Sequence, residues 1–249
     1  MISTSQLKLI KSLSQKKYRK IHQLFLAEGV KVVEELLSSS LSIHSLYATP
    51  QWLNQNIGKA RKIRIANINE INDLTLKSIS SLENPNQVLA IAEIPKLKDI
   101  IPSGFDLAVE SIRDPGNLGT IIRIADWYGL PQLLCSEDCV DAYNPKVIQA
   151  SMGSIFRVSV HYLDLNAFIK TNIEIHSYAA SLNGKSLNEV QIEFPSLLVI
   201  GNESKGISPD IEQSVSECIA IARYGHAESL NAAVATGILT DYFKRVKNI

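Results

Sequence analysis

Three short segments of the sequence place glycines beside polar side chains that could do chemistry. The first reads ESIRDPGNLGTIIR and ends at Arg123. An apolar run precedes it and a helical pattern follows, so its backbone amides are expected at the carboxyl end of a strand, where α/β sheets bind ligands. Asn117 and Arg123 are its polar candidates. Arg123 lies one helical turn from Gly119, which leaves two interpretations open: a guanidinium that faces a ligand, or a solvated ion pair with Asp126.

The second segment follows the apolar run LLVI and reads GNESKGIS, from Gly201 to Ser208. Gly201 and Gly206 suit a turn that needs positive φ. Glu203 stands with Asn202 at the expected tip of a strand, where burying a carboxylate costs free energy unless it has a partner. Ser208 precedes a proline, and this pair predicts the first turn of a new helix.

The third segment reads IARYGHAESLN, from Ile221 to Asn231, and precedes a helical pattern over residues 232–246. Ser229 or Asn231 is expected to cap that helix, because short polar side chains accept hydrogen bonds from its first free amides. The helix starts with AAVATG, and such small residues allow another part of the backbone to approach closely. Each segment alone is a weak signal for a binding site.

Together, the order and content of the three segments resemble the motifs of the SpoU branch of the SPOUT RNA methyltransferases. The matching residues are NLGTIIR at 117–123, GNESKG at 201–206 and ESLN at 228–231, and the resemblance covers about residues 104–245. It implies an enzyme that transfers a methyl group from S-adenosylmethionine to a ribose 2′-hydroxyl of RNA, with rRNA as the expected substrate and tRNA as the alternative. It also implies a homodimer formed through an α/β catalytic domain with a C-terminal deep trefoil knot, one of the rare exceptions to unknotted chains.

The resemblance assigns roles to individual residues. The residues expected to be catalytic are Arg123, Asn117, Glu203, Ser229 and Asn231. The residues expected to contact the cofactor are Ala180, Ser181, Gly201, Asn202, Gly206, Ile221 and Leu230. Because an arginine stays protonated, Arg123 is expected to stabilise the developing alkoxide or to hold the neighbouring phosphate, although in the family it is also discussed as the base. Ala222 and Arg223 depart from the Pro-Met pair common in the family, which affects the expected contacts with the adenine of the cofactor.

Charge is unevenly distributed along the chain, although 25 basic and 25 acidic residues balance overall. Residues 1–98 hold 14 Lys and Arg against 7 Asp and Glu, whereas residues 99–249 hold 11 against 18. Six basic residues come before the first acidic one: Lys8, Lys11, Lys16, Lys17, Arg19 and Lys20. Apolar residues are interleaved with them, namely Leu7, Ile10, Leu13, Tyr18 and Ile21. This stretch is either a solvated arm or a helical surface with basic side chains outward, and its positive potential suits a phosphate backbone.

The charge asymmetry and a linker predict two domains. Residues 94–104, with two prolines and a glycine, are the linker candidate. Residues 1–98 are predicted to be a basic domain that binds the RNA substrate, and residues 10–37 resemble the small substrate-binding domain that precedes the catalytic domain in many family members. Residues 99–249 are predicted to be the knotted methyltransferase domain that binds S-adenosylmethionine.

The elements that must position the three segments follow from the apolar patterns. Buried strands are expected at residues 107–112, 132–135, 157–162, 175–180, 197–201 and 217–222, with helical patterns between them. This alternation predicts an α/β fold with a mostly parallel sheet and helices on both faces. In the first half, helices at 28–37 and 71–82 alternate with strands at 46–49, 62–66 and 88–94, so this half is also predicted to be α/β.

Composition excludes several classes of protein. The chain is 45% hydrophobic and 20% charged, as in globular proteins rather than disordered or fibrous ones. It has no run of about 18 apolar residues and does not begin like a signal peptide, so a cytoplasmic protein without a membrane partner is expected. Three cysteines are too few for a disulfide framework, and no histidine lies near Cys135 and Cys139, so buried thiols are expected rather than a metal site.

Two functions other than methyl transfer stay open on the sequence alone. A non-catalytic RNA-binding protein could keep the same fold, although the presence of Arg123, Glu203 and Asn231 argues against it. A dinucleotide-binding enzyme would need a third glycine in the first segment, where only Gly116 and Gly119 match the spacing. Binding of S-adenosylmethionine or of NAD, measured by calorimetry, would separate these functions.

Overall fold

The computed structural model describes residues 2–62, 65 and 67–247 of the 249-residue chain. The chain forms two compact units. The N-terminal unit comprises Met1–Lys96 together with Asp141–Phe156, and the C-terminal unit comprises Leu97–Val140 together with Arg157–Ile249. Segment 141–156 therefore belongs to the unit formed by the start of the chain. The assignment of RNA binding to residues 1–98 and of cofactor binding to residues 99–249 stays a prediction.

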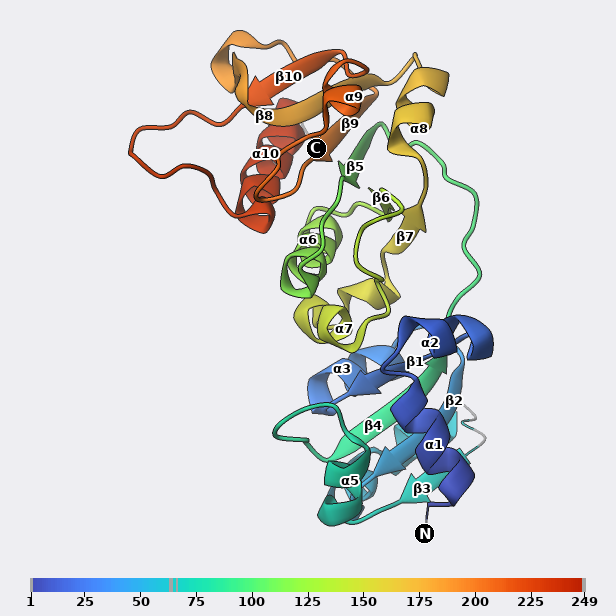
Figure 1. The fold of residues 1–249 in the computed structure, drawn as a ribbon. Helices are drawn as coiled ribbons and strands as arrows, with labels where there is room; N and C mark the ends of the chain where they lie inside the picture. Colours follow the sequence, from blue (N-terminus) through green and yellow to red (C-terminus); the bar gives the residue numbers. More distant parts are fainter. Residues whose placement is uncertain (1, 63–64, 66, 248–249) are drawn as a thin grey trace. The chain divides into compact units, whose positions relative to one another are not determined.

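The N-terminal unit is an α/β structure built on a four-stranded sheet (Figure 1). Its elements are α1 (Thr4–Ser12), α2 (Lys16–His22), β1 (Leu24–Glu28), α3 (Val30–Leu37), β2 (Ile43–Ala48), α4 (Pro50–Lys62), β3 (Asn67–Glu70), α5 (Asp73–Ile79), β4 (Val88–Glu93), α7 (Pro145–Ser151) and the 3-10 helix η1 (Ser154–Phe156). The strands lie in the order β1-β4-β2-β3. β2 and β3 are parallel, whereas β4 runs antiparallel to both β1 and β2.

The first residues of the chain are an ordered part of this unit. Ile10 and Leu13 pack with Leu26 of β1 in one hydrophobic cluster, so α1 is attached to the sheet. The helical-surface interpretation is confirmed, and the solvated arm is wrong. Two orientations are reversed, however: Arg19 is only 2% exposed, whereas Ile21 is 61% exposed. The expectation that Arg19 faces outward is wrong because its guanidinium binds a carboxylate and two backbone carbonyls inside the unit.

Most of the predicted elements of the first half are present. The helices predicted at 28–37 and 71–82 are α3 and α5, and the strands predicted at 46–49 and 88–94 overlap β2 and β4. The predictions missed β1, α4 and β3. The strand predicted at 62–66 is wrong at Lys62, which ends α4, while residues 63, 64 and 66 lie outside the described residues.

The C-terminal unit carries a six-stranded sheet. Its elements are β5 (Phe105–Val109), α6 (Pro115–Trp127), β6 (Gln132–Cys135), β7 (Ser159–Tyr162), α8 (Leu165–Thr171), β8 (His176–Ser186), the 3-10 helix η2 (Leu187–Glu189), β9 (Ser196–Ile200), α9 (Pro209–Glu212), β10 (Glu217–Ala220) and α10 (Ala232–Val246). The strand order is β10-β8-β9-β5-β6-β7, and within the described residues all neighbouring strands of this sheet run parallel. The predicted parallel α/β sheet is confirmed.

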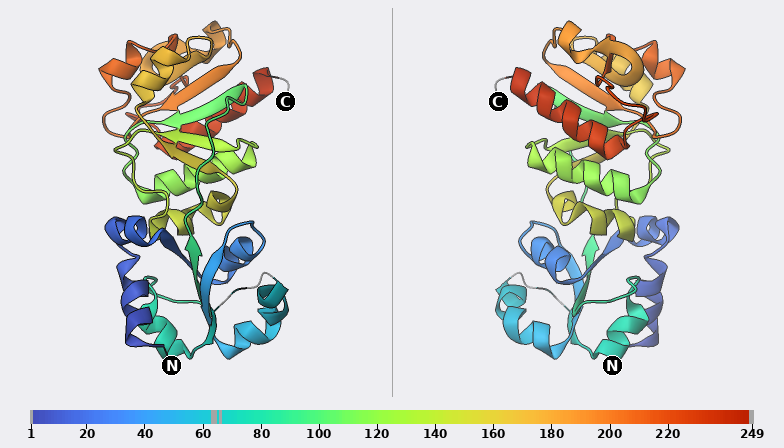
Figure 2. Two further views of the ribbon diagram at one scale, coloured as in Figure 1. Left: turned by 90° about the vertical axis from the view of Figure 1, so that its right-hand side faces the viewer. Right: turned by 90° about the vertical axis from the view of Figure 1, so that its left-hand side faces the viewer.

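Helices cover both faces of this sheet. On one face, α6 and α10 pack against each other (Figure 2). Phe243 of α10 stacks on Phe105 of β5, with ring centroids 5.1 Å apart. On the other face, Ile169 of α8 and Ile211 of α9 join a hydrophobic cluster with Val199 of β9. Both helical layers therefore hold the strands whose carboxyl ends lead into the three polar segments.

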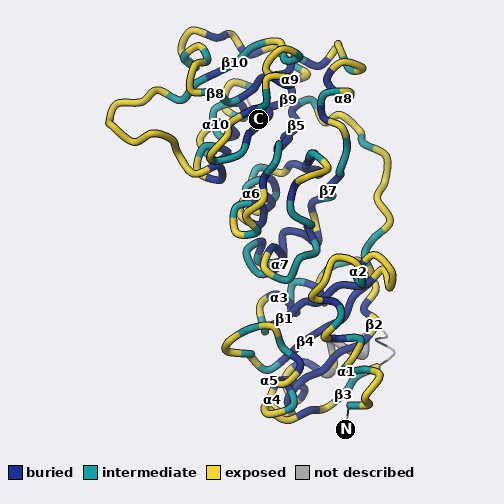
Figure 3. The backbone as a smooth tube through the Cα atoms, in the orientation of Figure 1, coloured by how far each residue is buried: buried dark blue, intermediate teal, exposed yellow. Residues whose placement is uncertain are grey.

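Each polar segment contains the N-cap residue of a helix. Asp114 caps α6, Ser208 caps α9 and Asn231 caps α10, each by accepting a hydrogen bond from a backbone amide of the first turn. The predicted caps at Ser208 and Asn231 are confirmed. The third segment is otherwise a long loop between β10 and α10, and its residues 222–231 are exposed throughout (Figure 3).

Candidate active site

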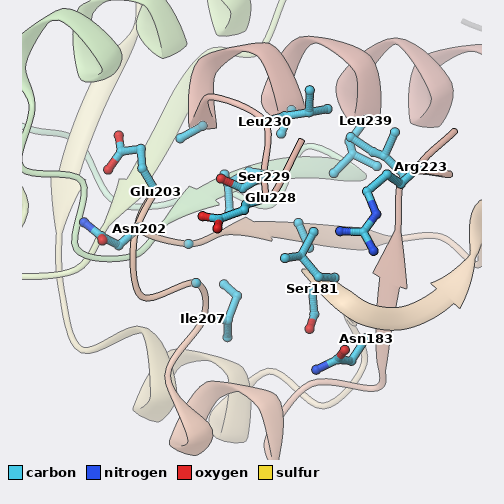
Figure 4. Close-up of a pocket in the computed structure, with 18 of the residues that line it drawn as sticks. Ser181, Asn183, Asn202, Glu203, Ile207, Arg223, Glu228, Ser229, Leu230 and Leu239 are labelled. Carbon is cyan, nitrogen blue, oxygen red and sulfur yellow. The ribbon is translucent and has the colours of Figure 1, made fainter. Parts of the chain in front are cut away.

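A pocket of about 870 Å³ lies in the C-terminal unit beside β8, β9 and β10 (Figure 4). All residues predicted to contact the cofactor line it: Ala180, Ser181, Gly201, Asn202, Gly206, Ile221 and Leu230. Of the residues predicted to be catalytic, Glu203 and Ser229 also line it. The volume lies within the range of about 300–1,000 Å³ that is common for small-molecule sites. The second and third segments therefore meet at one cavity, whereas Asn117, Arg123 and Asn231 do not line it, and the role of each residue stays a prediction.

The loop after β9 forms one wall of the pocket and requires glycine at two positions. The Asn202 amide donates to the Gly206 carbonyl at 3.1 Å, and the Gly206 amide donates back to the Asn202 carbonyl at 2.8 Å. A Cβ atom at Gly201 would lie 2.4 Å from the carbonyl carbon of Gly206, and Gly206 itself has φ of +68°. Side chains larger than hydrogen would therefore disrupt this turn, which presents its backbone to the pocket.

Asn202 holds the same turn and connects it to the first segment. Its Oδ1 accepts hydrogen bonds from the amides of Ser204 at 3.0 Å and Lys205 at 3.1 Å. Its Nδ2 donates to the carbonyl oxygen of Ser111 at 2.9 Å. The side chain of Asn202 is thus engaged with backbone at both ends, which makes it a support of the pocket wall.

Glu203, Asn117 and Asn231 form a chain of hydrogen bonds that links all three segments. Asn117 Nδ2 donates to Glu203 Oε1, which supplies the partner that a carboxylate needs at this strand tip. Asn231 Nδ2 donates to Asn117 Oδ1 at 2.8 Å, while Asn231 Oδ1 accepts from the Ala233 amide at 2.9 Å. Residues up to 114 positions apart in the sequence therefore form one polar network beside the pocket.

Arg123 lies on α6 with its side chain exposed. The solvated ion pair with Asp126 is wrong, because Asp126 binds Arg157 instead, with Nη2 and Oδ2 2.8 Å apart. Within the described residues, no hydrogen bond or ion pair involves Arg123, and Arg123 is not among the residues that line the pocket. The guanidinium is therefore free to bind a ligand that approaches from outside the pocket.

A cluster that the sequence did not point to supports the first segment. Ser111 has φ of +56°, its amide donates to Ser136 Oγ at 2.8 Å, and its hydroxyl donates to Asp138 Oδ2 at 2.6 Å. Partial burial raises the pKa of Asp138, but hydrogen bonds from Ser111, Ser136 and Arg113 outweigh that effect and place its pKa below the usual value. This cluster holds Ser111 in a left-handed conformation that turns its carbonyl toward Asn202.

Charged groups of both signs line the pocket: Glu203, Lys205, Glu212, Arg223 and Glu228. Ser181 Oγ donates to Glu212 Oε1 at 3.1 Å. Figure 4 shows Arg223 and Glu228 extending from the β10–α10 loop toward the cavity. Such a mixture suits a small zwitterionic ligand with an additional positive charge.

Three other findings concern the described residues. Cys135 and Cys139 are buried, and together with Cys218 they are free thiols. No group of His, Cys, Asp or Glu in this part of the chain could hold a metal ion. None of the helices that the structure describes is long and apolar enough to cross a membrane.

Comparisons with known proteins give two family matches along the chain. The SpoU rRNA methylase family matches residues 104–241, and the MRM3-like substrate binding domain matches residues 4–90. The 23S rRNA (guanosine(2553)-2'-O)-methyltransferase RlmP of Bacillus subtilis is 28% identical over 239 residues, with 94% of each chain covered. A crystal structure of an rRNA methyltransferase from Sinorhizobium meliloti with bound AdoMet superposes with a TM-score of 0.86 at 29% identity, covering 98% of this chain and 97% of that one.

A relative with a different named target extends the comparison. The 23S rRNA (uridine(2479)-2'-O)-methyltransferase of Streptomyces viridochromogenes is 28% identical over 234 residues, covering 86% of this chain and 80% of that one. The family match spans more than half of the chain and contains all three polar segments. This protein belongs to the SpoU rRNA methylase family.

Proposed function

We propose that this protein methylates a ribose 2′-hydroxyl of ribosomal RNA and uses S-adenosylmethionine as the methyl donor. The observation that carries the proposal is that the second and third motifs line one pocket, while Asn117 of the first motif is hydrogen-bonded at its side to Glu203 and Asn231. The named relatives act on 23S rRNA, and a related structure holds AdoMet.

The pocket fits S-adenosylmethionine in its chemistry. When bound, this cofactor supplies a methyl group on a positively charged sulfonium. The carboxylates of Glu203 and Glu228 can balance positive charge, and the guanidinium of Arg223 can balance a carboxylate. Backbone around Gly201 and Gly206 supplies amides and carbonyls for neutral polar groups, as the motifs imply.

Arg123 is proposed to act on the RNA side of the reaction. A ribose hydroxyl is a poor nucleophile at neutral pH, so its attack must be assisted while its proton leaves. The free guanidinium of Arg123 can stabilise negative charge on the 2′-oxygen or bind the adjacent phosphate. Asn117, Asn231 and Ser229 are proposed to orient the ribose, with Glu203 holding Asn117 in place.

The N-terminal unit is proposed to capture the RNA. Residues 1–98 carry twice as many basic as acidic residues, 14 against 7, and the match to a substrate binding domain lies within them. A phosphate backbone is attracted by such an excess of positive charge. The cytoplasmic location expected from the sequence fits this substrate and stays a prediction, as does the trefoil knot.

A homodimer formed through the C-terminal unit is part of the proposal. Val234 and Ile238, four residues apart on α10, are 51% and 41% exposed, and Trp127 at the end of α6 is 84% exposed. Because α6 and α10 pack together, these side chains give the helix pair an apolar outer surface that a second copy would cover. Light scattering should give about twice 27.5 kDa at micromolar concentration, and a monomer would reject the dimer.

The methyl-transfer proposal is tested with purified protein. Calorimetry should detect binding of S-adenosylmethionine and no binding of NAD. Single-turnover transfer of labelled methyl to an unmodified 23S rRNA transcript should then yield a ribose 2′-O-methyl group, with a tRNA mixture as the competing substrate. Cofactor binding without transfer to either RNA would instead support a non-catalytic RNA-binding protein.

A further inference from the structure

Helix α2 is attached to the N-terminal unit by one side chain. Among its seven residues, KKYRKIH, all of which the structure describes, only Arg19 is buried. Its Nη1 donates to the carbonyl oxygens of Leu13 and Ser14, both at 2.8 Å, and its Nε donates to Asp141 Oδ2 at 2.9 Å. Tyr18 is half-buried and the other five side chains of α2 are exposed, so hydrophobic burial contributes little to holding this helix.

Five lysines on α1 and α2 form an uncompensated positive surface. They are Lys8, Lys11, Lys16, Lys17 and Lys20, and each is exposed. Within the described residues none of them has an ion-pair partner, and residues 2–27 contain no Asp or Glu. Asp141, the carboxylate that reaches this region, is already bound to Arg19. The positive charge is therefore available to an anionic partner.

An aromatic pair lies among these lysines. Tyr18 and His22 are four residues apart on α2, and their rings stack with centroids 6.4 Å apart and an angle of 17° between the planes. Flat rings beside cationic side chains are what proteins use to stack unpaired bases. A membrane surface would instead require a wide apolar face, and Ile21 is the exposed large apolar residue of α2.

We infer that α1 and α2 form a docking surface for RNA, in which the five lysines bind phosphates and the Tyr18–His22 pair stacks on an unpaired base. This inference rests on the proposed function for its choice of RNA as partner. It goes further by locating the contact on two helices and by separating phosphate contacts from base stacking. Arg19 has no direct role, because it is the buried anchor that holds α2 in place.

The lysines are tested by salt dependence of RNA affinity. The variant K11Q/K16Q/K17Q/K20Q removes four charges from the docking surface, and the matched variant K31Q/K77Q/K96Q/K98Q removes four exposed lysines elsewhere in residues 1–98. Affinity for an unmodified 23S rRNA transcript is measured by fluorescence anisotropy at several salt concentrations. The slope of log K against log[salt] should fall by roughly 3–4 in the first variant and stay near wild type in the second. Equal slopes in both variants would overturn the inference.

The aromatic pair is tested separately. Tyr18→Ala should weaken RNA binding about tenfold without changing the salt slope, whereas Tyr18→Phe should retain the affinity because the ring remains. Ultraviolet cross-linking of wild-type protein to the same transcript should modify the peptide that contains residues 16–22, and cross-links confined to other regions would contradict the inference even if a variant failed to fold.

Cofactor binding distinguishes this inference from the proposed function. Every docking-surface variant should bind S-adenosylmethionine like wild type, because the pocket lies in the other unit. Absence of cofactor binding by the wild-type protein would reject the methyltransferase and leave the RNA measurements intact. Lysine-dependent binding to vesicles of anionic phospholipid, with unchanged binding to RNA, would replace RNA by a membrane as the partner.

Discussion

Arg123 is the side chain on which the proposed chemistry depends most. It is exposed, it has no hydrogen-bond or ion-pair partner within the described residues, and it is carried by the helix that also holds Asn117. A solvated arginine tolerates replacement within about half a kcal/mol of stability. Replacement of an arginine that stabilises a transition state instead lowers the rate of methyl transfer. Measurements of stability and of this rate therefore distinguish the two roles.

Arg123→Ala should fold normally and bind S-adenosylmethionine like wild type, yet lose methyl transfer by roughly 100- to 1,000-fold, because one preorganised electrostatic donor is removed. Arg123→Lys should restore little, since an ammonium lacks the forked geometry of a guanidinium. The measurement is single-turnover transfer of labelled methyl to rRNA. A near-normal rate in the alanine variant would show that Arg123 is not catalytic.

Gly201 should be irreplaceable for a steric reason. Gly201→Ala would place a Cβ 2.4 Å from the backbone of Gly206, so the turn must open at a free-energy cost of about 1–3 kcal/mol. Affinity for S-adenosylmethionine should fall about tenfold or more. Gly225→Ala is the matched control, because Gly225 also lines the pocket and its Cβ would meet nothing within 4 Å. Titration calorimetry on both variants decides, and equal affinities would refute the steric argument.

At the scale of elements, the loop after β6 supports the loop after β5. Asp138 and Ser136 hold Ser111, whose carbonyl in turn binds Asn202 of the loop after β9. The loops that follow three neighbouring strands, β9, β5 and β6, are thereby connected at the carboxyl ends of these strands. The contacts join residues 25 to 91 positions apart, which explains why no local pattern in the sequence indicated them.

The contribution of Asp138 to the stability of the folded state should depend on pH. A carboxyl whose pKa is lowered on folding stabilises the native state above the unfolded pKa of about 3.9 and loses that contribution as pH falls through the folded pKa. Asp138→Asn should therefore lower the free energy of unfolding at pH 7, by less than about 1 kcal/mol because the Asp138 side chain is 44% exposed. Urea unfolding should show this difference shrinking below pH 4, and a constant difference would argue against the cluster.

The prediction of helices and strands succeeded where the apolar residues followed one clear pattern. The bounds predicted for the strand at 132–135 and the helix at 232–246 are those of β6 and α10. β1 was missed because all five of its residues are buried, so it lacks the alternation that marks a half-buried strand. β8 extends to Ser186, beyond the predicted residue 180, because its polar second half pairs with β10, a contact that only the tertiary fold supplies. All seven residues predicted to contact the cofactor line the pocket, whereas the support from Ser111 and Asp138 was not predicted.

At the scale of the whole molecule, the two units have separate cores and should respond separately to mutation. Arg19 binds Asp141 within the N-terminal unit, where their side chains are 2% and 17% exposed. The pocket lies in the C-terminal unit. A change at this ion pair should therefore destabilise one unit and leave cofactor binding by the other intact.

Arg19→Met should lower the stability of the N-terminal unit by about 3 kcal/mol, because it leaves Asp141 partly buried without its partner. The double variant R19M/D141N should recover part of this loss, since no unpaired charge remains. Scanning calorimetry with S-adenosylmethionine identifies the C-terminal transition, because a ligand raises the Tm of the unit that binds it. A downward shift of that transition in R19M would contradict the separation of the units.

The N-terminal unit draws on two stretches of chain, Met1–Lys96 and Asp141–Phe156, with 44 residues of the other unit between them, Leu97–Val140. Phe25 of β1 lies 4.9 Å from the ring of Tyr143 and 6.1 Å from that of Phe156, so the second stretch completes the first. A nascent chain that has emerged only as far as residue 140 still lacks these aromatic partners. During translation, the N-terminal unit can therefore complete its fold only after residues 97–140 of the C-terminal unit have left the ribosome.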